Sequence, residues 1–295
     1  MTGTNSRRSA LVSTILWILS LLITAVCFTY QDKTGPTYPL DGWLRTAKGP
    51  VHFRFLRSET IGTTLKIMLL DPIPSGITGY VKFRRYKSND AWSSFPFHAG
   101  EFEYERRGRK ESGKGAGVEL PTLNERAGKY EYYVYISDGV GEPVSVTGEE
   151  PIYARYKAAV PTGVLVIHIL VIFASMMFAV RTGFEAVADG NCQWMLWATT
   201  VSLVLGAFVL GPLVQWYVFG VWWSGIPFGY DWTDNKVLLE LAAWVGALFL
   251  NRGNRRNRRS VYVAAAVTLV VYFIPHSVFG SEYNYTTGTG HGTAG

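Results

Sequence analysis

The chain has 295 residues, of which 48% are hydrophobic, 15% aromatic and 17% charged. Soluble globular chains carry about 25% charged residues, so this composition favours an integral membrane protein over a soluble one. Residues 31–157 carry 19 basic and 16 acidic residues, so the net charge of +6 is not concentrated on one folded face, and this argues against nucleic-acid binding.

The first predicted element is a membrane span within residues 1–30. Residues 9–30 carry no charge and follow Arg7 and Arg8. About 20 apolar residues are enough to cross a bilayer as a helix, whereas a cleaved signal peptide has a shorter apolar core. Cys27 lies inside this run, and the other cysteine, Cys192, is not part of a CxxC or Cys/His cluster. The cysteines therefore indicate neither a disulfide framework nor covalently attached haem.

Residues 31–159 predict an all-β domain with nearly balanced charge. Short alternating or β-branched segments are separated by turn residues, which is typical of a two-sheet sandwich. The predicted strands are VHFRFLR, TLKIMLL, GYVKFRRY, SSFPF, GVEL, KYEYYVYI and IYARYK.

One motif in this domain resembles a known family. The stretch LPTLNERAGKYEYYVYI is similar to the corner before strand F of immunoglobulin and fibronectin type III domains. The resemblance implies an immunoglobulin-like sandwich in which the hydroxyl of Tyr130 bonds back across the corner, with Tyr132 and Tyr133 as the alternatives. Such domains bind or space other molecules, but the fold alone defines no function.

Residues 160–279 predict a four-helix membrane domain. Hydrophobic runs are separated by short polar links, and His168, Glu240 and His276 fall within or at the ends of the runs. The predicted spans are 160–180, 194–219, 237–250 and 260–279.

Basic residues predict the orientation of the five spans. Arg7 and Arg8 precede the first span, and the link NRGNRRNRR between the last two spans holds five arginines. Such segments stay in the cytoplasm, so the N-terminus is predicted inside and the C-terminus outside. The chain is therefore expected in a bacterial cytoplasmic (inner) membrane, in contact with lipid, with the β domain on the periplasmic or extracellular side. The Gly/Thr-rich tail 280–295 is predicted to be disordered.

An aromatic loop, FGVWWSGIPFGYDWTDNK, lies between the third and fourth spans on the predicted outer side. His168 and His276 are predicted in the same leaflet, as is Glu240. Ionisable residues inside membranes usually face the bundle interior and mark sites, and imidazole ligates both b-type haem and metals. One hypothesis is therefore a haem b or metal site formed by His168, His276 and Glu240 under this loop.

The same residues resemble the tryptophan-rich "WWD" haem-handling proteins of cytochrome c maturation. The matching positions are Trp222, Trp223, Asp231, Trp232 and Trp244, flanked by His168 and His276. The resemblance implies that these residues bind haem. The sequence departs from the pattern because Tyr230 precedes Asp231 and both histidines lie within spans or at their ends.

The alternative is that the loop is a structural lid. Trp and Tyr concentrate where a membrane meets water, and Asp231 or Thr233 can cap the helix that follows. Glu240 would then pair with Lys236 one turn back, and the histidines would hydrogen-bond neighbouring helices.

Two classes of function follow from these readings. The first is a non-catalytic accessory or assembly subunit of a membrane complex, respiratory or otherwise redox, whose β domain docks a periplasmic protein. The second is a haem- or metal-binding membrane protein. Hydrolase and transporter functions are disfavoured, because the sequence shows neither a nucleophile constellation nor an inverted repeat.

Overall fold

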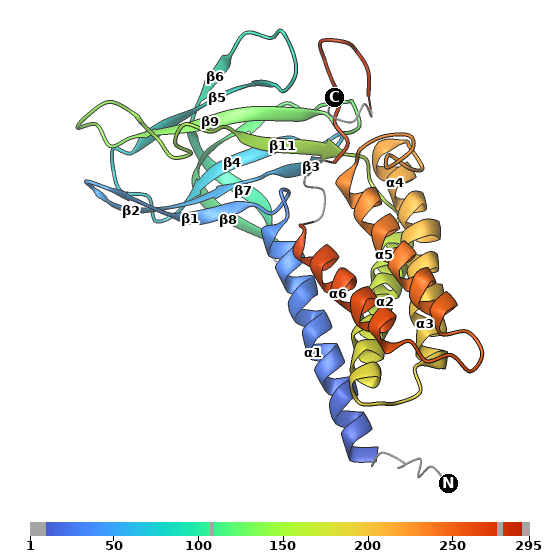
Figure 1. The fold of residues 1–295 in the computed structure, drawn as a ribbon. Coiled ribbons are helices and arrows are strands. Elements are labelled where there is room, and N and C mark those ends of the chain that lie inside the picture. The colour runs from blue at the N-terminus through green and yellow to red at the C-terminus, as the bar shows by residue number, and fades with distance from the viewer. Residues whose placement is uncertain (1–9, 107–108, 276–279, 291–295) are drawn as a thin grey trace. The chain divides into compact units, whose positions relative to one another are not determined.

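The structure, a computed structural model, describes residues 10–106, 109–275 and 280–290. These residues form two compact units, one helical and one made of β-strands (Figure 1). The helical unit holds residues 10–35, 160–216 and 221–275, and the β unit holds residues 36–159, 217–220 and 280–290 within the described ranges. A β-rich domain between the first and second helices was predicted from the sequence and is confirmed.

Among the residues that the structure describes, three helical segments are long and apolar enough to cross a membrane, namely Ala10–Thr34, Thr162–Val187 and Gln193–Phe219. The third is not a uniform α-helix, because a wider π-helical turn, η1, interrupts it. The helices are α1 (Ala10–Thr34), α2 (Thr162–Val187), α3 (Gln193–Leu203), η1 (Val204–Leu210), α4 (Gly211–Phe219), α5 (Trp232–Leu250) and α6 (Arg258–Phe273).

Helices α5 and α6 differ from the first three for identifiable reasons. Helix α5 carries Asp234, Lys236 and Glu240 in its first half, which lowers its hydropathy. Helix α6 has 16 residues, about 24 Å at 1.5 Å per residue, whereas a hydrocarbon core is about 30 Å thick. It ends just before Pro275, because proline disfavours helical backbone at the preceding residue. Crossing by α5 and α6 therefore stays a prediction.

Contacts at one end of the helical unit bring α1, α2 and α6 together. The guanidinium of Arg181, late in α2, donates to Ser13 Oγ near the start of α1 at 3.5 Å. Asp189, in the link after α2, forms an ion pair with Arg258 at the start of α6. The start of α1, the α2–α3 link and the arginine-rich α5–α6 link therefore share this end.

Contacts at the opposite end join the other termini of the same helices. Gln31, late in α1, donates to the carbonyl of Tyr272 at the end of α6 at 3.0 Å. Lys236, early in α5, donates to the carbonyl of Ile274 just beyond α6 at 2.8 Å. Helix α6 thus runs parallel to α1 and antiparallel to α5, as the fifth span of a five-span chain would relative to the first and fourth.

The β unit consists of two sheets and eleven strands within the described residues. One sheet has the order β1 (Leu40–Thr46), β2 (Gly49–Phe55), β4 (Leu65–Leu70), β8 (Arg109–Leu120), β7 (His98–Arg106). The other has the order β3 (Ser58–Thr60), β11 (Ile152–Lys157), β9 (Lys129–Ser137), β5 (Thr78–Arg85), β6 (Ser93–Pro96), with β10 (Val144–Ser145) also on β9. Only β3 and β11 pair in parallel; the other pairs are antiparallel.

The two sheets enclose one apolar core. Alternate residues of β2 and β4, such as Phe55 and Ile67, pack with residues of β5 and β9, such as Val81 and Val134. All seven predicted strands are present. The edge strand β1, the short strands β3 and β10, and the strand β7 were not among the predicted strands, and β8 begins at Arg109, well before the predicted segment GVEL.

The predicted tyrosine corner takes a different form. The ring of Tyr130 packs edge-on against Phe83 and Tyr156 in the core. The two alternatives do donate to backbone carbonyls: the hydroxyl of the fully buried Tyr132 to that of Leu56 at 2.7 Å, and the hydroxyl of Tyr133 to that of Glu149 at 3.2 Å. The first bond joins β9 to the β2–β3 link and the second joins it to the β10–β11 link, so neither spans the corner before β9. The immunoglobulin-like relationship stays a prediction.

The tail differs from the predicted disorder over its described part, residues 280–290. Backbone bonds join Tyr283 N to Ala127 O and Thr286 N to Lys87 O at 3.1 and 3.0 Å. The carboxylate of Glu282 pairs with Lys87 and with Lys129, the latter at 2.7 Å. The prediction of disorder was based on the Gly/Thr-rich composition, which does not reveal these few side chains that anchor the tail.

We expect docking of the tail to depend on pH through Glu282. Burial acts to raise the pKa of this carboxyl, but Lys129 and Lys87 together hold it below 4.5. Because the docked pKa lies below the free one, the stabilising contribution is complete above about pH 4.5 and is lost as pH falls through the docked pKa. Hydrogen exchange at the Tyr283 and Thr286 amides, corrected for intrinsic rates, should show protection falling below that pH. In the Glu282→Gln variant this pH dependence should be absent. Equal protection in the wild-type protein at pH 7 and pH 3 would refute the role of Glu282 in docking the tail.

Candidate functional site

The aromatic loop 220–231 is packed through ring stacking. Trp222 stacks on Trp216 with ring centroids 5.1 Å apart, and Trp223 stacks on Phe208 at 5.5 Å. The indole N–H of Trp223 donates to the carbonyl of Ile226 at 3.1 Å. Two of the predicted haem-contacting tryptophans therefore lie against α4 and η1 and have ring partners there.

The polar side chains beside the loop bind the loop itself. Asp234 accepts hydrogen bonds from the backbone N–H of Ser224 at 2.7 Å, from the Ser224 hydroxyl at 3.1 Å and from the Gln215 amide at 3.2 Å. Asn235 accepts from the N–H of Ile226 at 2.8 Å. A buried carboxylate with three donors satisfies buried polar groups that would otherwise be costly to desolvate. These bonds favour the lid interpretation.

Asp231 serves as the N-cap of α5, as the lid interpretation predicts. Its carboxylate accepts from the N–H of Thr233 at 2.8 Å, and its own N–H donates to Ser224 O at 3.1 Å. Asp231 is 4% exposed, whereas the adjacent Trp232 is 51% exposed. Asp231 is therefore a buried helix cap, and Trp232 is an aromatic residue on the surface.

Deeper in the helical unit, three buried side chains form a hydrogen-bonded chain. The indole N–H of Trp244 donates to the hydroxyl of Thr268 at 2.8 Å, and this hydroxyl donates to Glu240 Oε1 at 2.8 Å. All three are at most 2% exposed. These hydrogen bonds join α5 to α6. Trp244 and Glu240, two of the residues predicted to form a site, therefore act as a polar link between helices.

The expected pairing of Glu240 with Lys236 takes a different form. The ammonium of Lys236 donates to the carbonyl of Ile274, and the carboxyl of Glu240 accepts from Thr268. Lys236 is 5% exposed and satisfies a carbonyl that helix α6 leaves free where it ends. Both ionisable groups therefore hold α5 against α6 through separate partners.

His168 contacts the π-helical turn. Its Nδ1 lies 3.1 Å from the carbonyl oxygen of Gly206 within η1. A carbonyl can only accept, so Nδ1 carries the proton and Nε2 carries the lone pair in the neutral ring. The imidazole thus satisfies a carbonyl at an irregular turn, a role that the lid interpretation predicts.

The proposed ligand set does not meet within the described residues. His276 lies outside those residues. Among the described residues, no group of three or more His, Cys, Asp or Glu side chains is placed to hold a metal ion. His168 bonds to η1 and Glu240 bonds to α6, so the shared site of His168, His276 and Glu240 stays a prediction.

We expect Asp234→Ala to destabilise the helical unit by about 1–3 kcal/mol, because the buried N–H of Ser224 loses its acceptor. Ser224 is 4% exposed, so water does not replace the carboxylate. Removing the cap with Asp231→Ala should cost about 1 kcal/mol. Unfolding of each variant in detergent, followed by tryptophan fluorescence, measures both. Equal stability of Asp234→Ala and the wild-type protein would contradict this role of Asp234.

Sequence reasoning missed Gln215, Ser224 and Thr268. Gln215 is the one strongly polar residue of the run 194–219, and a polar residue inside a span is a signal that could have been used. Thr268 gave no such signal, because threonine is common in membrane helices and its partner lies 28 residues away on another helix.

The β unit carries an aromatic side chain, Trp43, that is largely exposed and is also held in place. Trp43, on the edge strand β1, is 60% exposed and stacks on His52 with ring centroids 4.7 Å apart. The ring of His52 is within 2.8 Å of Asp41, which also accepts from Arg54 at 2.7 Å. This ordered network orients an indole that faces solvent.

Comparison with protein-family models, with curated proteins and with solved structures finds no match for this chain. Its function is therefore argued from its own residues, and both family resemblances remain predictions.

Proposed function

We propose that this chain is a multi-pass membrane subunit without catalytic activity of its own, whose β unit docks a protein partner on the outer side of a bacterial cytoplasmic membrane. The observation that carries the proposal is Trp43. It is exposed on a seven-residue edge strand and stacks on His52, whose ring is within hydrogen-bond distance of Asp41. Rigid exposed aromatics are the side chains that dominate binding energy at protein interfaces, and an unpaired sheet edge can accept a partner strand.

The placement of two segments supports the membrane topology of the proposal. Residues 217–220, which close α4, pack in the β unit, where Ala158 N donates to Val218 O at 3.3 Å. Residues 280–290, which follow α6, also pack there. The chain must therefore cross the membrane an even number of times between residue 160 and each of these segments. Four crossings after the β unit, as the five-span proposal requires, meet this condition.

A photo-reactive residue at position 43 tests the proposal. We expect p-benzoylphenylalanine in place of Trp43 to give one discrete protein adduct in native membranes, and the same residue in place of Phe95 to give none. Phe95 is 40% exposed on the edge strand β6 of the other sheet, so it is a matched control. The partner should also be lost from preparations of Trp43→Ala. Failure of position 43 to form a protein adduct in the folded protein would refute docking at this edge.

The second candidate is a haem- or metal-binding protein. The observation that favours it is the Nδ1 bond of His168, because a neutral imidazole protonated at Nδ1 has Nε2 free to ligate iron. Absorption spectra of the purified protein, oxidised and reduced, with metal analysis, test it. A Soret band that disappears in His168→Ala would establish this candidate. A flat spectrum with no stoichiometric metal would eliminate it.

A further inference from the structure

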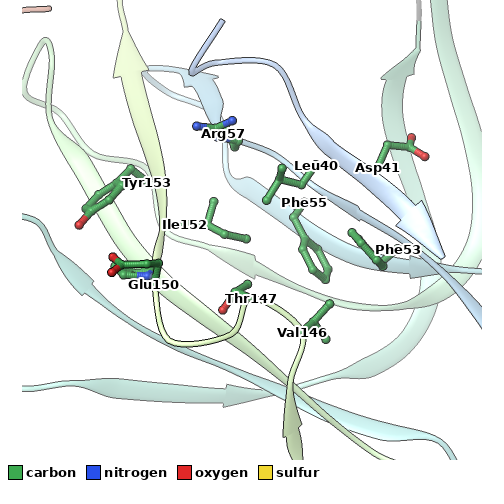
Figure 2. Close-up of a pocket in the computed structure, with 11 residues that line it drawn as sticks. Leu40, Asp41, Phe53, Phe55, Arg57, Val146, Thr147, Glu150, Ile152 and Tyr153 are labelled. Atoms are coloured by element: carbon green, nitrogen blue, oxygen red, sulfur yellow. The ribbon is translucent and has the colours of Figure 1, made fainter. Parts of the chain in front are cut away.

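A pocket of about 460 Å³ opens between the two sheets of the β unit. Its size lies in the range of small-molecule sites, roughly 300–1,000 Å³. One side is formed by β1 and β2, and the other by β11 and the link before it, as Figure 2 shows. Leu40, Phe53, Phe55, Val146 and Ile152 give it an apolar interior.

Arg57 is the one basic side chain that lines this pocket (Figure 2). Two other arginines of the unit are paired, Arg54 with Asp41 and Arg84 with Glu131. Within the described residues no carboxylate lies within ion-pair distance of the Arg57 guanidinium. Burial lowers the pKa of Arg57 below its usual range, so this cation has lost hydration without gaining an anionic partner.

The acidic side chains at the pocket do not form ion pairs with Arg57. Asp41 is engaged by His52 and Arg54. Glu150 is exposed to solvent and lies at the side of the pocket near Tyr153 (Figure 2). A guanidinium presents paired donors that match the two oxygens of a carboxylate. Beside an apolar cavity, this selects a carboxylate attached to an apolar group.

We propose that this pocket binds a carboxylate carried on an apolar body, with the carboxylate on Arg57 and the apolar group between Phe53, Phe55 and Ile152. The C-terminal residue of a protein chain and a free organic acid share this chemistry. If the occupant is the C-terminal residue of a protein, this inference rests on the proposed docking function; if it is a free organic acid, it does not. Pocket binding is measured without any partner, so its failure is distinguishable from failure of the cross-link at position 43.

Binding to the full-length protein in detergent micelles provides the test. The probes are acetyl-Ala-Ala-Phe with a free carboxylate, the same peptide as its C-terminal amide, and 3-phenylpropionate. We expect at least one acid to bind, and the amide to bind about tenfold more weakly or worse than the peptide acid, because it loses a charge-assisted hydrogen bond. If the peptide acid binds more tightly than 3-phenylpropionate, the occupant is a chain terminus. If 3-phenylpropionate binds equally or more tightly, the occupant is a free acid.

Three variants locate the site. Arg57→Gln should weaken acid binding about tenfold or more, whereas Arg45→Gln, which removes an exposed arginine of β1, should not change it. Val146→Phe should block the cavity while Arg57 remains, and thermal unfolding checks that each variant is folded. The proposal is overturned if neither acid binds the wild-type protein at millimolar concentration, if the amide binds as well as the acid, or if Arg57→Gln binds unchanged.

Discussion

Trp244→Ala should destabilise the helical unit by about 3–5 kcal/mol, the range for truncating a buried large aromatic residue. Trp244 is fully buried and is the largest such side chain in the described residues. It packs with Leu196, Leu203 and Val261, so its removal leaves a cavity between α3, α5 and α6. It also donates to Thr268, and that hydroxyl would lose one of its partners.

Trp244→Phe separates the two contributions. Phenylalanine keeps much of the ring volume but has no N–H, so we expect a loss of about 1–3 kcal/mol from the hydrogen bond and the smaller ring. The order of stability should be wild type, then Phe, then Ala, measured by SDS-induced unfolding in detergent micelles. An alanine variant within about 1 kcal/mol of the wild-type protein would show that the helices close over the cavity.

Arg181→Met should cost about 3–5 kcal/mol, because it removes one partner of a buried ion pair. Arg181 donates to Glu185 at 2.6 Å, and their side chains are 2% and 12% exposed. The guanidinium also lies 5.3 Å from the ring centroid of Trp17 on α1. Without the arginine, the carboxylate of Glu185 loses this hydrogen-bonded cation.

The double variant Arg181→Met, Glu185→Gln is the matched control. Removing both charges should restore most of the stability, since replacing a buried ion pair by neutral groups is often nearly neutral. The same SDS titration measures the double-mutant cycle. Additive losses in the cycle would mean that the two side chains act independently, contrary to their contact.

The sequence predicted the elements whose signal is local. The runs around Ile18 and Ile169 predict spans because apolar length alone decides membrane crossing. Strand β9 was predicted from the alternation of its residues, and Asp231 from the residue types that cap helices. The position of the β domain after the first helix followed from the block of charged residues between apolar runs.

The parts that escaped prediction depend on partners far away in the chain. Glu282 looks like a charge in a glycine-rich tail until Lys87 and Lys129 are placed beside it. Strand β1 has a weak β pattern, and it forms because β2 pairs with it over seven residues. Arg57 is unremarkable in VHFRFLR; only the packing of two sheets shows that it lines a pocket.

The central claim is that the β unit faces outward, on the same side as the tail and opposite the arginine-rich link. Labelling of single cysteines by a membrane-impermeant maleimide in intact cells tests it most directly, after Cys27 and Cys192 are replaced by serine. Val140→Cys, at a position 76% exposed in the β unit, and Thr287→Cys in the tail should react in intact cells. Asn254→Cys, in the link between α5 and α6, should react only after permeabilisation. Labelling of Asn254→Cys in intact cells together with protection of Val140→Cys would place the β unit inside and contradict the account.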